Sequence, residues 1–251
     1  MELILIGGAL LIGAIIAGGI VHKNTSQDTQ DTLNPPSFSE TTKVKEDSLI
    51  STSQGTVETP TVNASDWNLL LVNPWNKIPD DFSVELTQLK DGHAIDERAY
   101  PDLQDMMDAM RTEGLSPFIC SSYRTNEKQQ TLYNNKVSEY LAEGYRQSEA
   151  EAEASRWVAV PGTSEHQTGL AVDIVDMNYQ LLDEQQEDTA VQKWLMKNSY
   201  QYGFILRYPS DKSEITGIYY EPWHYRYVGK EAAKEIYEQG ICFEEYLDTL
   251  K

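Results

Sequence analysis

Residues 164–175 read "SEHQTGLAVDIV", a polar loop that runs into a short apolar segment. The apolar part predicts a buried β-strand. Alternate residues of a strand face opposite sides, so Asp173 faces away from Leu170 and Val172. An aspartate in an apolar strand is costly unless it is paired or coordinates a cation. The segment therefore predicts a core strand and, together with His166, a candidate metal site.

The segment "EPWHYRYV", which begins at Glu221, is a second candidate strand. Alternation places Trp223 and Tyr225 on one face and His224 on the other. Proline is tolerated only at an edge, at a bulge or at the start of a strand. We expect Pro222 to kink the backbone so that Glu221 reaches the face of His224.

Two histidines and one aspartate match the three protein ligands of a catalytic zinc, whose fourth position stays open for water. His166, Asp173 and His224 are the candidate ligands of one zinc ion per chain. Glu221 would then be the base that deprotonates the water. The bare spacing leaves another interpretation open, in which the histidines are hydrogen-bonded core residues and the aspartate caps a turn.

Arg124 follows the apolar stretch "LSPFICSSYR" and is a further candidate. A guanidinium at the end of a strand can hold a carboxylate through two hydrogen bonds. The alternative is a surface arginine at the start of a helix. Gln129 lies five positions after Arg124, so its amide reaches the same pocket only if the chain enters the helix at a suitable angle. Tyr208 either lines the pocket or belongs to the core.

The other segments do not alternate regularly between strand and helix patterns. We predict strands at 115–124, 170–177, 204–209 and 219–228 and at the start of 67–82, and helices over 97–113, 125–144, 148–157, 190–203 and 230–240. In the helix over 97–113, Leu103, Met106, Met107 and Met110 recur at helical spacing. This order predicts an α+β domain with a small, mainly antiparallel sheet covered by helices.

The N-terminal part differs in composition from the rest. Residues 3–21 carry no charge, and as a helix they would cover about 28 Å, close to the hydrocarbon thickness of a bilayer. We predict a membrane anchor over 1–23, a disordered tether rich in Ser, Thr and Asp over 24–65, and one folded domain over 66–251. A cleaved signal peptide is the alternative. The positive-inside rule does not support an exported domain, because the nearby cation, Lys23, follows the apolar segment and so lies on the side of that domain.

The formal net charge of the 251-residue chain is -20, and no basic stripe is present. This composition excludes nucleic acid as a partner. Two cysteines, Cys120 and Cys242, are too few for a disulfide framework or a cysteine zinc site. We expect buried thiols, and a single bridge between them stays open for an extracellular domain.

The motifs together resemble those of the VanY-type zinc D-alanyl-D-alanine carboxypeptidases. "SEHQTGLAVDI" matches the Ser-x-His-x-x-Gly-x-Ala-x-Asp signature, and "EPWHYRYVG" matches the Glu-x-Trp-His signature. The likeness extends over residues 67–249 and leaves out the predicted anchor and tether. It implies a fold of the hedgehog and D-Ala-D-Ala-peptidase type.

The resemblance also implies a role for each matching residue. His166, Asp173 and His224 would hold zinc, Glu221 would act as general base and then as acid, and Arg124 would stabilise the developing anion. Gln129, Ser164, Tyr208 and Trp223 would contribute to the substrate pocket. The implied reaction removes the terminal D-alanine from peptidoglycan stem peptides or their precursors.

The implied setting is a monomeric enzyme on the outer face of a Gram-positive membrane, with a contribution to glycopeptide resistance. Two enzymatic alternatives remain: an L,D-carboxypeptidase that trims tetrapeptide stems, and a cell-wall endopeptidase. A third is a cell-wall-binding module with structural zinc, as in hedgehog-type relatives. Glu221 argues against that module because a structural zinc site needs no base.

Overall fold

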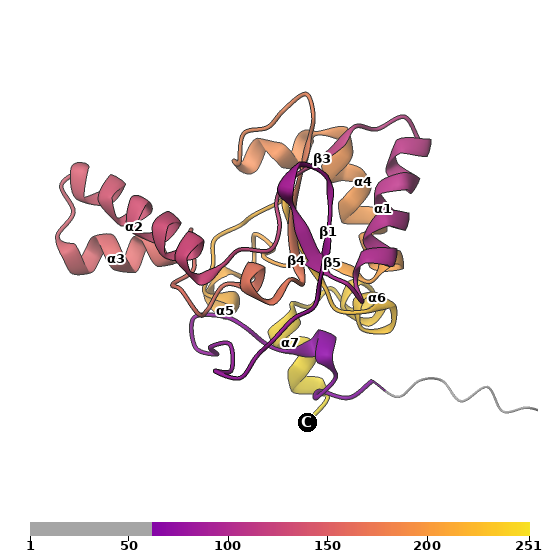
Figure 1. Cartoon of the computed structure of the whole chain (residues 1–251), viewed down its shortest axis with the longest axis horizontal. Helices are drawn as coiled ribbons and strands as arrows, with labels where there is room; N and C mark the ends of the chain where they lie inside the picture. The colour runs from indigo at the N-terminus through magenta and orange to yellow at the C-terminus, as the bar shows by residue number, and fades with distance from the viewer. Residues whose placement is uncertain (1–61) are drawn as a thin grey trace, which may run out of the picture. The chain divides into compact units, whose positions relative to one another are not determined.

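A computed structural model of the chain describes residues 62–251 (Figure 1). The predicted anchor at 1–23 and nearly all of the predicted tether at 24–65 lie outside these residues. Among the residues described, no helix is both long and apolar enough to cross a membrane.

Strands and helices follow one another without regular alternation, as the sequence predicts. The strands are β1 (Leu86–Gln88), β2 (Ala94–Asp96), β3 (Pro117–Ser121), β4 (Ala171–Asp176), β5 (Phe204–Leu206) and β6 (His224–Tyr227). The α-helices are α1 (Tyr100–Thr112), α2 (Asn126–Ala142), α3 (Gln147–Ser155), α4 (Ala190–Asn198), α5 (Ser213–Thr216), α6 (Lys230–Gln239) and α7 (Phe243–Thr249). Short 3-10 helices are η1 (Trp67–Leu69), η2 (Lys90–Gly92), η3 (Glu165–Thr168), η4 (Glu184–Asp188) and η5 (Ser199–Tyr202).

The central sheet has the strand order β3-β4-β6-β5, and every neighbouring pair is antiparallel. A separate hairpin pairs β1 with β2, also antiparallel. The prediction of an α+β domain with a small antiparallel sheet is therefore confirmed. Strand β4, the strand of the quoted segment, lies inside the sheet between β3 and β6.

The main hydrophobic core lies where α1 and α4 pack against the sheet (Figure 1). Its helical side includes Leu103, Met106 and Met110, which recur every three or four residues and so share one face of α1. Its strand side includes Val172 of β4 and Tyr225 of β6. Burying each such side chain stabilises the fold by roughly 1.5–3 kcal/mol.

A second core joins the C-terminal helices to strand β5. Ile205 of β5 packs there with Ile236 of α6 and with Phe243 and Tyr246 of α7. The C-terminal helices are thus part of the domain that carries the sheet.

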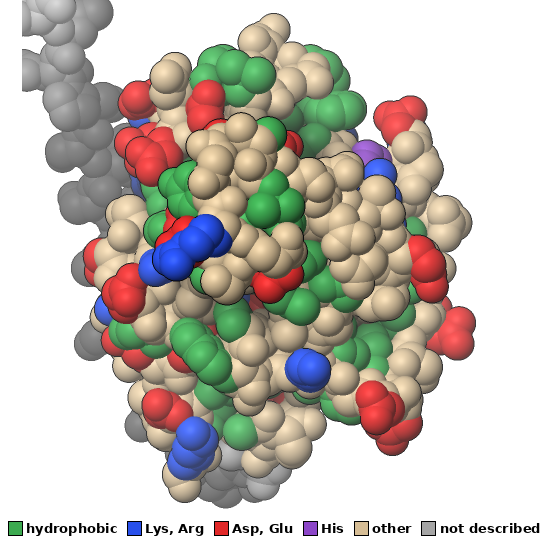
Figure 2. All heavy atoms as spheres, turned by 90° about the vertical axis from the view of Figure 1, so that its left-hand side faces the viewer, with side chains coloured by type: hydrophobic (Ala, Val, Ile, Leu, Met, Phe, Trp, Pro, Cys, Tyr) green, Lys and Arg blue, Asp and Glu red, His purple; other side chains and the backbone are tan. Residues whose placement is uncertain are grey.

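Helices α2 and α3 form an antiparallel arm that projects away from the sheet (Figure 1). The Thr125 side chain caps α2 by accepting a hydrogen bond from the backbone N–H of Lys128. The buried core of the arm is small and consists of Val137, Ala150 and Ala154. Figure 2 views the domain from the arm end and shows acidic side chains spread around the margin of this face.

Two expectations about strands were wrong. The segment from Trp67 forms 3-10 helix η1 and then irregular backbone. The Arg226 guanidinium donates hydrogen bonds to the carbonyl oxygens of Asn68 and Leu70, so these carbonyls are not available to pair with a neighbouring strand. Strand β6 begins only at His224, so Trp223 precedes the strand and the alternation rule does not place it.

The two cysteines lie in the described part of the chain, and both are free thiols. The Cys242 side chain is buried and the Cys120 side chain is half-buried. Burial raises the pKa of the Cys120 thiol to about 12, which keeps it protonated and unreactive.

Candidate metal centre and active site

The register of the sheet brings two candidate ligands side by side. Asp173 of β4 is paired directly with His224 of β6. Residues directly opposite each other on antiparallel strands share a face, with Cβ atoms about 4.5–5.5 Å apart. The Nδ1 atom of His224 lies 3.0 Å from Oδ1 of Asp173.

The third candidate ligand arrives from the short helix η3, which precedes β4. Gly169 ends η3 with a positive φ of 75°, a conformation that glycine adopts without steric cost, and the chain then turns into β4. The Nε2 atom of His166 lies 3.2 Å from Oδ2 of Asp173. The Nδ1 atom of His166 lies 2.9 Å from the carbonyl oxygen of Ser122. A carbonyl only accepts, so Nδ1 carries the proton and Nε2 faces the aspartate.

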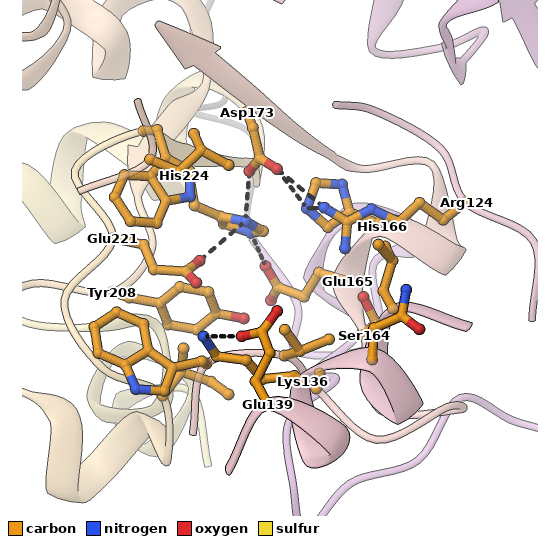
Figure 3. Close-up of a pocket in the computed structure, with 18 residues that line it drawn as sticks. Arg124, Lys136, Glu139, Ser164, Glu165, His166, Asp173, Tyr208, Glu221 and His224 are labelled. Carbon is orange, nitrogen blue, oxygen red and sulfur yellow. Dashed lines mark hydrogen bonds and ion pairs between the residues drawn. The ribbon is translucent and has the colours of Figure 1, made fainter. Parts of the chain in front are cut away.

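His166, Asp173 and His224 form a compact set of metal-ligand atoms, which lie within 4.8 Å of one another (Figure 3). All three side chains are buried, and Oδ1 of Asp173 accepts no hydrogen bond. An unsatisfied buried carboxylate oxygen is costly unless a cation compensates it. Two imidazoles and one carboxylate are ligands that zinc accepts, so these residues fit a zinc ion.

The electrostatics of the three residues favour bound positive charge. Burial is the main cause that lowers the pKa of His166 to about 4, so this imidazole is neutral, as a metal ligand must be. Burial alone would lower the pKa of His224 as well, but the neighbouring carboxylates of Asp173 and Glu165 raise it to about 9. The carboxylates around His224 thus stabilise a positive charge at its position, which is also the condition for holding a divalent cation.

Glu221 reaches the same site from the backbone just before β6. Its Oε2 atom lies 3.7 Å from Nδ1 of His224, so it does reach His224 as expected. Pro222 and Trp223 separate it from β6, whereas the predicted strand over 219–228 included Glu221. Burial, reinforced by the charge of Asp173, raises the pKa of Glu221 to about 8. A carboxyl group with a raised pKa beside a metal site is suited to accept a proton and return it near neutral pH.

Arg124 extends from the loop after β3 to the edge of the ligand set. Its Nη2 atom lies 3.0 Å from Oδ2 of Asp173 and 3.0 Å from Nε2 of His166. Gln129 accepts a hydrogen bond from Nη1 of Arg124 at 3.2 Å and donates to the carbonyl oxygen of Ala159 at 2.7 Å. Gln129 is therefore placed to hold Arg124, and it is not among the residues that line the cavity.

A cavity of about 410 Å³ opens over these residues. From the sheet side it is lined by Arg124, Ser164, Glu165, His166, Asp173, Tyr208, Ile218, Glu221, Trp223 and His224. From the arm and the segment after it the lining residues are Leu132, Asn135, Lys136, Glu139, Trp157, Val158 and Ala159, and Leu182 completes the wall. The predicted pocket residues Ser164, Tyr208 and Trp223 thus face the cavity. Alternation had placed Trp223 on the opposite face from His224, which is wrong.

Glu165 is a site residue that the sequence did not single out. It occupies the variable position of the Ser-x-His motif, where a surface loop residue is the default interpretation. In the structure its side chain is fully enclosed, and Oε2 lies 3.4 Å from Nε2 of His224. The guanidinium groups of Arg207 and Arg226 outweigh the effect of burial and hold the pKa of Glu165 well below its usual range.

A buried set of two histidines and one aspartate, with a glutamate and an arginine facing the same cavity, defines a metal-dependent hydrolase. The family model described as "VanY: D-alanyl-D-alanine carboxypeptidase" matches residues 92–230. A D-alanyl-D-alanine carboxypeptidase of Enterococcus faecalis is 56% identical over 187 residues, which cover 74% of this chain and 68% of the relative. The chain belongs to the VanY family of D-alanyl-D-alanine carboxypeptidases, which are zinc-dependent hydrolases.

Solved structures give the same picture. The structure described as "VanYB in complex with D-Alanine-D-Alanine" is 55% identical in sequence, with a TM-score of 0.69. The matched region covers 74% of this chain and 100% of the VanYB chain. A VanY mutant from a VanB-type resistance cassette, in complex with Zn(II), is also 55% identical, with a TM-score of 0.67 and coverages of 72% and 99%. The LD-carboxypeptidase LdcB is 38% identical, with a TM-score of 0.62 and coverages of 73% and 87%. Zinc is accordingly the cofactor.

Proposed function

We propose that this chain removes the terminal D-alanine from peptidoglycan stem peptides that end in D-Ala-D-Ala, with His166, Asp173 and His224 as the zinc ligands. The observation that carries this proposal is the buried His-Asp-His set with Glu221 facing the same cavity. Zinc, when bound, supplies a Lewis acid that acidifies water and polarises the scissile carbonyl. The other steps fall to the side chains around it.

Glu221 is the proposed proton carrier. Its carboxylate accepts the proton of the attacking water and then delivers it to the nitrogen of the leaving D-alanine. Its position 3.7 Å from Nδ1 of His224 places it beside the ligand set without making it a member of that set. A non-catalytic module would have no use for this side chain, since a structural zinc closes its coordination with ligands.

Arg124 is the proposed anion stabiliser. Its guanidinium lies at the edge of the ligand set, where negative charge develops on the carbonyl oxygen during attack. Removal of one such contact in other hydrolases costs about 10²- to 10³-fold in rate. Ser164, Tyr208 and Trp223 line the cavity and would shape the pocket for the terminal D-alanine.

The arm is proposed to receive the part of the stem peptide that precedes the scissile bond. Lys136 and Glu139 both line the cavity from α2, and Nζ of Lys136 lies 3.0 Å from Oε2 of Glu139 (Figure 3). A stem peptide carries a carboxylate on its glutamate residue and an amine on its lysine or diaminopimelate residue. The mixed pair offers each of these groups a partner of opposite charge.

The similarity to an LD-carboxypeptidase supports a second candidate activity, the trimming of tetrapeptides that end in a single D-alanine. We favour the D,D-activity because the identity to the VanY structures is higher, 55% against 38%. The setting is a further part of the proposal. Residues 1–23 would anchor the chain in the membrane, residues 24–65 would tether the domain, and residues 66–251 would act as a monomer on the outer face of a Gram-positive cell. There the reaction would contribute to glycopeptide resistance.

Release of free D-alanine tests this function. The purified chain is incubated with a muramyl pentapeptide ending in D-Ala-D-Ala and, separately, with the tetrapeptide ending in one D-alanine, each with and without a chelator. We expect cleavage of the pentapeptide, loss of activity with the chelator and recovery with zinc. Cleavage of the tetrapeptide alone would move the chain to the L,D-class, and no cleavage of either peptide would overturn the proposal.

A further inference from the structure

Glu165 links the ligand set to two buried arginines. Its Oε1 atom accepts hydrogen bonds from Nε of Arg207 and from Nη1 of Arg226, both at 2.7 Å. Its Oε2 atom faces Nε2 of His224 at 3.4 Å. Both arginines and Glu165 are fully enclosed, so water does not compete for these contacts.

The arginines are themselves held from several directions. Arg207 donates to both carboxylate oxygens of Glu244 on α7, at 2.9 and 2.6 Å. Arg226 donates to the carbonyl oxygens of Leu70 and Asn68, at 2.8 and 3.1 Å. The carboxylate of Glu165 therefore cannot rotate away from His224 without breaking charge-assisted hydrogen bonds in a dry environment, where such bonds are strong.

This arrangement decides which nitrogen of His224 can bind a metal. An ionised carboxylate only accepts hydrogen bonds, so Nε2 of His224 carries a proton and donates it to Glu165. The other nitrogen, Nδ1, faces Asp173 and Glu221. His166 has the opposite arrangement, because its Nδ1–H donates a hydrogen bond to the Ser122 carbonyl and Nε2 is left as the nitrogen that could bind a metal.

We infer that Glu165 is a positioning residue for the metal centre, which selects the tautomer and the ring orientation of His224 through a hydrogen bond that the Arg207–Arg226 pair holds in place. This inference rests on His224 being a zinc ligand, as proposed above. Partners in the outer shell of a metal-bound histidine raise its basicity and fix its orientation, and their loss costs about 10- to 100-fold in metal affinity. Glu165 acts through His224 and needs no contact with the substrate.

The test is the dissociation constant for zinc, measured by competition with a chromophoric chelator on the full chain. The variants are Glu165→Gln, which keeps the shape and removes the charge, and Asp96→Asn as a matched control. Asp96 is also a buried carboxylate that an arginine holds, since it accepts from Nε of Arg98 at 2.9 Å, but it contacts none of the proposed ligands. Unfolding by denaturant in the presence of the chelator reports the stability of each variant without metal.

We expect Glu165→Gln to weaken zinc binding by about 10- to 100-fold, while Asp96→Asn leaves the dissociation constant within about threefold of the wild-type value. Both variants lose stability, so zinc affinity separates a positioning role from a structural one. Equal zinc affinity of Glu165→Gln and the wild-type chain would overturn the inference. Failure of the wild-type chain to bind zinc would instead overturn the proposed ligand set.

A further variant covers the case in which Glu165→Gln does not fold. Glu165→Asp keeps the charge for both arginines and withdraws the carboxylate from His224 by one methylene group. We expect it to fold and to bind zinc more weakly than the wild-type chain. Wild-type affinity in a folded Glu165→Asp protein would contradict the assignment just as directly.

Discussion

The sheet-side wall of the cavity and its arm-side wall differ in how their charges are held. On the sheet side, Glu165, Asp173, Arg207 and Arg226 are buried and are held by strand register and multiple hydrogen bonds. On the arm side, Lys136 and Glu139 are partly or largely exposed on one face of a helix. A buried charge tolerates little displacement, whereas an exposed ion pair contributes only about 0.2–1 kcal/mol.

The hydrophobic core behind the sheet-side wall is larger than the core behind the arm-side wall. The sheet carries a core built from α1, α4 and several strands, while the arm has only three buried apolar residues of its own. Segments with few buried contacts open locally at a lower free-energy cost. On the function proposed above, the residues that cleave the bond lie on the side with the larger core, and the residues proposed to contact the stem peptide lie on the side with the smaller core.

The largest expected effect comes from a zinc ligand on the sheet side. Asp173→Ala removes the carboxylate that lies between both histidines, so we expect loss of zinc and of all measurable D-alanine release. Metal content by atomic absorption, together with D-alanine release, measures both effects. Full zinc occupancy in this variant would show that the ligand set has been assigned wrongly.

The next effect concerns proton transfer without loss of metal. Glu221→Gln keeps the size of the side chain but removes the base, so we expect kcat to fall by about 10²- to 10⁴-fold while zinc content stays at the wild-type level. The measurement is single-substrate kinetics on the pentapeptide at saturating zinc. Full turnover in this variant would remove Glu221 from the mechanism.

Arg124 is expected to follow with a loss of about 10²- to 10³-fold in kcat/KM for Arg124→Ala. Arg124→Lys keeps the positive charge but not the planar fork, so we expect it to recover only part of the activity. Kinetics on the pentapeptide give both values. Unchanged kinetics in the alanine variant would place Arg124 outside the reaction.

The smallest effect belongs to the arm. Because Lys136 is half-buried and Glu139 is exposed, water competes for their contacts, so we expect Lys136→Gln or Glu139→Gln to raise KM for the pentapeptide by only about 1.5- to 5-fold and to leave kcat unchanged. A short acyl-D-Ala-D-Ala substrate, which lacks the charged upstream residues, should show no change. Lys234→Gln is the matched control, since Lys234 forms a similar exposed pair with Glu238 on α6.

A different result from the arm variants would sharpen the comparison of the two walls. An equal increase in KM for the short and the full substrate would mean that α2 supports the shape of the pocket and does not bind the upstream residues of the peptide. Unchanged KM for every substrate would confine recognition to the sheet side.

Most of the helices could be predicted from the sequence because their signals are local. Leu103, Met106 and Met110 recur with the period of a helix, and Thr125 is a regular cap, so α1 and α2 lie close to where their patterns place them. The segment after Trp67 resembles a strand in composition. Its carbonyl oxygens accept hydrogen bonds from Arg226 instead of from a neighbouring strand. No local pattern contains that information.

The candidate site divides in the same way. His166, Asp173, Glu221 and His224 could be identified by residue type and motif, and the structure brings all four together. Glu165 could not, because a glutamate in a loop is usually a surface residue. Only the two arginines from β6 and from the residue after β5 make its burial favourable, and they lie more than 40 positions away in the chain.

The sequence by itself determined the chemistry that this protein can perform, since ligand type, base and family signature are properties of the residues. The tertiary structure alone decided which nitrogen of each histidine faces Asp173, which side chains the arm adds to the cavity and how Glu165 is held. Those features depend on strand register and on contacts between distant segments. They follow from the packing of the whole domain, because a hydrogen bond or a buried charge is stable only where its partner has already been placed.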